Sequence, residues 1–219
     1  MILILARGAV FIDLIKMLTI TPKINQAIIL ASQLHFDKFR KGVEDKPVPY
    51  IVHPFSVAFI TARYTNDEVT IVSALLHDVL EDVRKDKYSG KDLTRDFGQK
   101  IYNIIKEDSE AKDAGITKEK ELKTWVARKT ETINHLKDHS QASLIVCCAD
   151  KIHNLQSLVA GLKKYGNGYY KNFNAPEPKR AKYLWYFDGI LKELKQNLKN
   201  KIVDELEQVY QEFKAVKEN

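Results

Sequence analysis

The segment of residues 75–82 constrains the fold more than any other part of the sequence. Four polar residues lie within six positions of an otherwise apolar stretch: His77, Asp78, Glu81 and Asp82. On a helix, at about 100° per residue, these side chains would share an arc of roughly 140°, and the flanking leucine, isoleucine and valine residues make the start of that helix apolar all round. Because buried carboxylates are unfavourable without a positive partner, the segment predicts a metal site in a helical core.

The rest of the chain indicates one helix after another. Glycine and proline are scarce, at 9 and 6 of 219 residues, which favours long helices over strands and turns. Apolar residues recur at helical spacing, and no internal repeat interrupts them. We expect helices over about 22–40, from 54, from an N-cap at Asp67, over about 91–107, 117–137 and 141–164, and from about 179 nearly to the end. The predicted fold class is all-α.

Composition and charge bound the classes of partner. The net charge of +6 indicates a basic surface, and attraction of a small polyanionic substrate is the alternative. Lysine and arginine are spread along the chain without a basic run, so we expect no nucleic-acid partner. The adjacent Cys147 and Cys148 cannot pair usefully and are typical of buried residues in a reduced, cytoplasmic protein.

The first sixteen residues are apolar but carry Arg7, Asp13 and Lys16, and they are too short to span a bilayer. They also lack the charge order of a secretory signal. We expect Met17 to be the natural start and residues 1–16 to be an optional or mis-assigned extension. A membrane anchor is the less favoured alternative, and no membrane partner is expected.

A second acid lies in an apolar helix. Asp150 follows the run at 144–149 directly, and Asn154 lies four residues later on the same helical face. Alone, Asp150 would be a hydrogen-bonded buried group. Together with His77, Asp78 and His53, which lies just before Pro54, it predicts one ion held by two imidazoles and two carboxylates. Such a set suits Mn²⁺, Fe²⁺ or Zn²⁺ and leaves positions for water and substrate.

The order of these residues resembles the HD-domain metal-dependent phosphohydrolases. Within them it is most similar to the alarmone hydrolase domain of the Rel/SpoT family, in particular its small single-domain members. Five blocks carry the resemblance: 39–42 (FRKG), 49–54 (PYIVHP), 74–82 (ALLHDVLED), 96–98 (DFG) and 149–155 (ADKIHNL). The resemblance implies an HD-domain helical bundle over residues 17–165, with a helical C-terminal extension over 166–219 packed on the same domain.

The resemblance also implies a function and a site. The activity would be hydrolysis of (p)ppGpp at its 3′-pyrophosphate, giving GDP and pyrophosphate as in the stringent response, usually with one Mn²⁺. The metal ligands would be His53, His77, Asp78 and Asp150. Glu81 and Asp82 would position and deprotonate the attacking water, Arg40 and Lys41 would grip the phosphates, and Asn154 would lie near the ribose and the scissile phosphate.

Departures from the family pattern concern the substrate and leave the metal ligands intact. They are Val83 after the Glu-Asp pair, Gln156 after the His-Asn block, and a longer loop between Arg40 and Tyr50. The partner is expected to be a small anionic nucleotide. One alternative is a phosphomonoesterase acting on a nucleoside monophosphate or a dinucleotide 2′-phosphate. Another is a nucleotide-binding sensor without turnover.

Other residues allow two interpretations. Arg128 and Lys129 belong to a charged helix face or reach a phosphate. The aromatic residues at 183–187 pack a core or an interface, or form a platform on which a base stacks. His153 is expected to support the site or to pack, without binding the metal. The C-terminal helix packs on its own domain or on a second copy in a homodimer.

Overall fold

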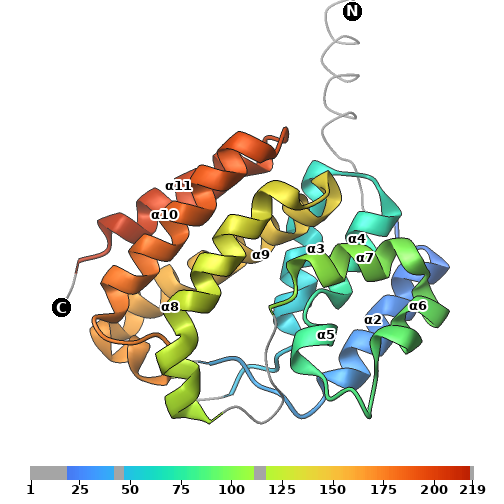
Figure 1. Ribbon diagram of the computed structural model, residues 1–219, viewed down its shortest axis with the longest axis horizontal. Coiled ribbons are helices and arrows are strands. Elements are labelled where there is room, and N and C mark those ends of the chain that lie inside the picture. Colours follow the sequence, from blue (N-terminus) through green and yellow to red (C-terminus); the bar gives the residue numbers. More distant parts are fainter. Residues whose placement is uncertain (1–18, 42–46, 111–116, 218–219) are drawn as a thin grey trace, which may run out of the picture.

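The computed structural model describes residues 19–41, 47–110 and 117–217, so the predicted extension at 1–16 lies outside the described residues. The regular elements of the described part are helices, together with one isolated bridge between Phe39 and Pro49 (Figure 1). They are α2 (Pro22–Leu34), α3 (Val52–Tyr64), α4 (Glu68–Leu76), α5 (Val79–Asp82), α6 (Gly90–Phe97), α7 (Gln99–Asp108), α8 (Lys118–His135), η1 (Leu136–Asp138), α9 (Gln141–Tyr165), η2 (Gly166–Asn172), α10 (Lys179–Asn197) and α11 (Ile202–Ala215). The all-α prediction is confirmed.

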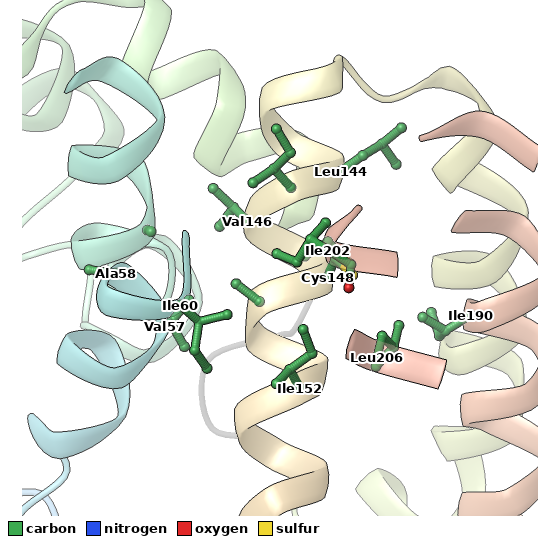
Figure 2. Packing of buried hydrophobic residues seen from close by; sticks show 14 of the residues in the cluster. Val57, Ala58, Ile60, Leu144, Val146, Cys148, Ile152, Ile190, Ile202 and Leu206 are labelled. Atoms are coloured by element: carbon green, nitrogen blue, oxygen red, sulfur yellow. The ribbon is translucent and has the colours of Figure 1, made fainter. Parts of the chain in front are cut away.

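Helix α9 is the central element. It contacts α3, α4 and α7 on one side and α10 and α11 on the other, and in Figure 1 it lies between these two groups. Figure 2 shows Val57 of α3 and Leu206 of α11 on opposite sides of Ile152 in α9. A helix enclosed on both sides must be apolar around most of its circumference, which explains the continuous apolar run at 144–149.

Side-chain caps fix several helix starts. Thr21 accepts a hydrogen bond from the Ile24 amide at 3.2 Å, and Ser140 accepts one from the Ser143 amide at 3.3 Å. The predicted N-cap Asp67 is confirmed, because its carboxylate accepts from the Thr70 amide at 3.0 Å. Each cap satisfies an amide that the helix itself leaves unbonded.

Several predicted helix limits were wrong, for local reasons. The first helix ends at Leu34 because residues 38–40 pair with 48–50 instead, through Arg40 N–H to Val48 O and Tyr50 N–H to Lys38 O. The helix expected over 91–107 is broken at Gly98, whose φ of 89° is a conformation that glycine adopts readily. The C-terminal helix is likewise divided, at 198–201.

The second and third helices differ from expectation where the site residues lie. His53 lies inside the first turn of α3 rather than before it. The helix expected to carry residues 75–82 ends at Leu76, and His77 and Asp78 form a turn before the short α5. The prediction of one continuous helix through this segment was therefore wrong.

Within the described residues, no helix combines the length and the apolar character that crossing a bilayer requires. Cys147 and Cys148 are free and buried, as expected. The Sγ of Cys148 lies 3.7 Å from the carbonyl oxygen of Ile202, at the contact between α9 and α11.

The packing of α11 on α9 predicts that the C-terminal helix shares one core with the central helix. Leu206→Ala should lower the free energy of unfolding by about 2–5 kcal/mol, because Leu206 is fully buried and the truncation leaves a cavity. Urea denaturation followed by far-UV circular dichroism measures this. The matched control is Glu207→Gln, which removes only an exposed ion pair with Lys195 and should change stability by less than about 1 kcal/mol. Equal effects of the two substitutions would contradict the shared core.

Candidate metal centre and its cleft

Four polar side chains from three parts of the chain converge on one point. His53 comes from α3, His77 and Asp78 from the turn after α4, and Asp150 from α9. The Nε2 of His53 lies 3.2 Å from the Nε2 of His77, 3.4 Å from Asp78 Oδ2 and 3.1 Å from Asp150 Oδ1. His77 Nε2 lies 3.2 Å from Asp78 Oδ2 and 3.8 Å from Asp150 Oδ1. The structure thus brings together the four predicted ligands.

Two neighbouring residues in the turn after α4 approach the same point. On a continuous helix His77 and Asp78 would point about 100° apart. Both residues have helical dihedral angles, but the helix ends there and Asp78 starts α5 instead. The imidazole and the carboxylate nevertheless approach each other to 3.2 Å.

Hydrogen bonds orient both imidazoles with Nε2 toward the centre. The Nδ1 of His77 lies 2.8 Å from the carbonyl oxygen of Ala74, which can only accept, so this nitrogen carries the proton. The Nδ1 of His53 lies 2.7 Å from the Nδ1 of His153. Burial, with the charges of His53 and Arg40, lowers the pKa of His153 to about 4, so His153 is neutral and can accept. These are the supporting bonds that metal-binding imidazoles require.

The two carboxylates are also held in place. Asp78 Oδ2 accepts a hydrogen bond from the Tyr50 hydroxyl at 2.5 Å. Asp150 Oδ1 accepts one from the Asn154 amide, and its Oδ2 forms an ion pair with Lys151, both at 2.5 Å. Burial raises the pKa of Asp150, but Lys151 and His53 outweigh burial and hold that pKa well below its usual range.

The donor set fits a divalent ion. Ligand atoms of His53, His77 and Asp150 all lie within 4.8 Å of one another. Asp78 adds a second carboxylate beside both imidazoles, so the charges of two carboxylates match one M²⁺. Without an ion, the two carboxylates act on the imidazole of His77 instead. Burial lowers the pKa of His77, but Asp78 and Asp150 outweigh burial and raise that pKa to about 10. A site that draws a proton onto a buried imidazole is a site suited to a cation.

His53, Asp78 and Asp150 line a cleft of about 520 Å³, and the buried His77 contacts His53 and Asp78. The structure brings the other predicted site residues to the same cleft: Arg40, Lys41, Glu81, Asp82 and Asn154. The guanidinium Nη2 of Arg40 donates to Asn154 Oδ1 at 3.1 Å, which connects it through Asn154 to Asp150. Acidic and basic groups therefore meet at the metal centre.

Sequence reasoning missed two residues at the centre and left a third open. Lys38 donates to the backbone carbonyl of Asp82, and its Nζ lies 3.6 Å from the Asp82 carboxylate. Tyr50 is the hydrogen-bond donor to Asp78; its place three residues before His53 was the available signal. Lys151, which the sequence left as a charge partner of Asp150, forms that ion pair.

Arg128 and Lys129 lie at the cleft and share one carboxylate partner. Both side chains line the cleft, and both form ion pairs with the carboxylate of Glu110. The Thr132 hydroxyl adds a hydrogen bond to the same carboxylate at 3.3 Å. They are part of the cleft wall and are not a solvated helix face.

Comparisons with known proteins found a family model and several similar proteins. A family model described as the HD domain matches residues 27–167. A guanosine-3′,5′-bis(diphosphate) 3′-pyrophosphohydrolase of Borreliella burgdorferi is 31% identical over 138 residues, which is 61% of this chain and 18% of that protein. The corresponding hydrolase MESH1 of Xenopus tropicalis is 32% identical over 135 residues, covering 61% of this chain and 68% of that protein.

A solved structure shows the same fold. It is described as a metazoan ortholog of SpoT that hydrolyzes ppGpp, and it matches with a TM-score of 0.69 at 22% identity, covering 90% of this chain and 98% of that chain. The match to this chain spans less than a fifth of the length of the longer relatives, such as 18% of the Borreliella protein. The likeness to the solved structure concerns the fold alone.

The charge on His77 predicts proton release when a metal binds. At pH 7 the metal-free imidazole of His77 carries a second proton and is positively charged, because its pKa of about 10 lies above the pH. A metal ligand must be deprotonated, so Mn²⁺ binding should release about one proton per ion. Titration calorimetry in buffers of different ionisation enthalpy measures this number. His77→Gln should bind more weakly and release fewer protons, whereas unchanged proton release in that variant would contradict the assignment.

Proposed function

The chain belongs to the HD-domain family, and we propose that it is a metal-dependent pyrophosphohydrolase that converts guanosine 3′,5′-bis(diphosphate) to GDP and pyrophosphate. The observation that carries the proposal is the convergence of two imidazole nitrogens and two carboxylates beside a cleft that is also lined by further acids and cations. The similar hydrolases of Borreliella burgdorferi and Xenopus tropicalis support the choice of substrate.

The ligands of the metal are His53, His77, Asp78 and Asp150, and we propose Mn²⁺ as the ion. Mixed nitrogen and oxygen donors suit manganese, iron or zinc, and the use of manganese by the resembled family favours the first. When bound, the ion activates a water and neutralises charge on the phosphate. Its carboxylate ligands stay ionised because the imidazoles and Lys151 keep the pKa values of Asp78 and Asp150 low.

The remaining residues of the centre have two roles, which are to position the attacking water and to bind the phosphate. Glu81 and Asp82 line the cleft beside the ligands, and we assign them the positioning and deprotonation of the attacking water. Lys38 next to Asp82 holds that carboxylate in place. Arg40 and Lys41 bind the phosphate oxygens, whose charge must be neutralised during transfer. Asn154 is hydrogen-bonded to both Arg40 and Asp150, and we assign it a contact with the ribose and the scissile phosphate.

The compartment and the partners follow from the substrate. We propose that the protein acts in the cytoplasm on a small anionic nucleotide, and the two free, buried cysteines are in keeping with a reducing environment. Association into a homodimer through the C-terminal helices remains a prediction.

Product identification tests the reaction. Mn²⁺-loaded protein should release pyrophosphate from guanosine 3′,5′-bis(diphosphate), with GDP as the other product, measured by ion-exchange chromatography across a nucleotide panel. Release of orthophosphate from a nucleoside monophosphate or a dinucleotide 2′-phosphate would support the phosphomonoesterase instead. Binding of the nucleotide without any product would support a sensor. No turnover of any member of the panel would contradict the proposed enzyme.

Two substitutions separate the metal ligands from the water-handling acids. Asp78→Ala should lose both metal and activity while remaining folded, because it removes one of the two ligand carboxylates. Glu81→Gln should keep the metal and lower kcat by about 10²- to 10⁴-fold, the usual contribution of a general base. Metal content by mass spectrometry, together with kcat, distinguishes the two roles. Wild-type activity in metal-free Asp78→Ala would contradict the mechanism.

A further inference from the structure

The cleft continues along α9 beyond the metal centre. Asp150, Asn154, Ser157 and Leu158 all line it from this helix. From Asp150 to Leu158 the helix rises about 12 Å, at 1.5 Å per residue. This is comparable to the span of one nucleotide from its 3′-phosphate to the outer edge of its base. A nucleotide with its phosphate at the metal centre therefore places its base near Leu158; this step rests on the proposed function.

The wall at that end of the cleft is aromatic. Trp125 of α8 and Phe173 both meet Tyr183 of α10 edge to face, each with ring centroids 6.0 Å apart. The ring of Tyr169 lies directly on Gly161 of α9, where a Cβ atom would come within 2.2 Å of it. Phe173 and Tyr183 are half-buried, and both line the cleft. Such a wall suits the packing of a planar ring.

One carboxylate interrupts this aromatic wall. Glu121 Oε2 accepts a hydrogen bond from the Asn174 amide at 2.7 Å, and both residues line the cleft. Among the described residues none donates a hydrogen bond to its Oε1. A carboxylate here repels phosphate, so this end must receive an uncharged part of the ligand. That part needs hydrogen-bond donors, because a carboxylate only accepts.

We infer that Glu121 reads the base of the nucleotide and selects guanine. Guanine carries two adjacent donors on one edge, N1–H and the N2 amino group, which match the two oxygens of a carboxylate. Adenine has an acceptor beside its amino group, and hypoxanthine lacks the N2 amino group. The Asn174 amide holds the carboxylate in its orientation, and the rings of Phe173 and Tyr183 pack against the base.

Binding of GDP and IDP tests this inference without any need for turnover. The two nucleotides differ only in the N2 amino group. Mn²⁺-loaded wild-type protein should bind GDP about ten- to a hundredfold more tightly than IDP by titration calorimetry, because a hydrogen bond to a charged group is lost. Glu121→Gln, which keeps the shape of the side chain, should reduce this preference to less than about threefold, mainly by weakening GDP binding.

A matched control lies on the same helix. Glu119 is exposed, with 77% of its side chain accessible, and pairs with Lys123 away from the cleft, so Glu119→Gln should keep the wild-type preference. Equal binding of GDP and IDP to the wild type, or an unchanged preference in Glu121→Gln, overturns the inference. A wild type that prefers GDP but hydrolyses none of the nucleotide panel contradicts the proposed reaction and leaves the reading of the base supported.

Discussion

The structure depends on two carboxylates that are held away from water in a helical bundle. Asp78 and Asp150 are unfavourable there unless positive charge or hydrogen-bond donors compensate them. The chain supplies Lys151 and Asn154 to Asp150 and the Tyr50 hydroxyl to Asp78. The imidazoles supply the remaining compensation, because His77 is protonated in the metal-free state and carries a positive charge. A divalent ion satisfies both carboxylates at once, and the core around α9 keeps the ligands in place.

Part of this arrangement was predictable from the sequence. Acids and histidines in apolar helical segments had to be buried, and their residue types, with the order of the family motifs, made His77, Asp78 and Asp150 candidates for one site. The capping residue Asp67 and the extent of α9 followed from local patterns in the same way. These features depend on residues that are close together in the sequence, so the local sequence pattern is sufficient to predict them.

The features that sequence reasoning missed depend on contacts between distant segments. No proline or glycine predicts the helix break at His77, which lies where His77 and Asp78 contact α9 and α3. Lys38 and Tyr50 reach the centre because residues 38–40 pair with 48–50. The contact of Glu110 with Arg128 and Lys129 likewise joins the chain before α8 to that helix. Periodicity within one segment cannot predict such pairings.

The central claim is that one ion is held by two histidine nitrogens and two carboxylates. Pulsed electron paramagnetic resonance of Mn²⁺-loaded protein tests it directly, because ¹⁴N modulation reports each bound imidazole. The structure predicts coupling to two histidine nitrogens, reduced to one in His53→Gln. A spectrum without nitrogen coupling, or one that His53→Gln leaves unchanged, would contradict the account.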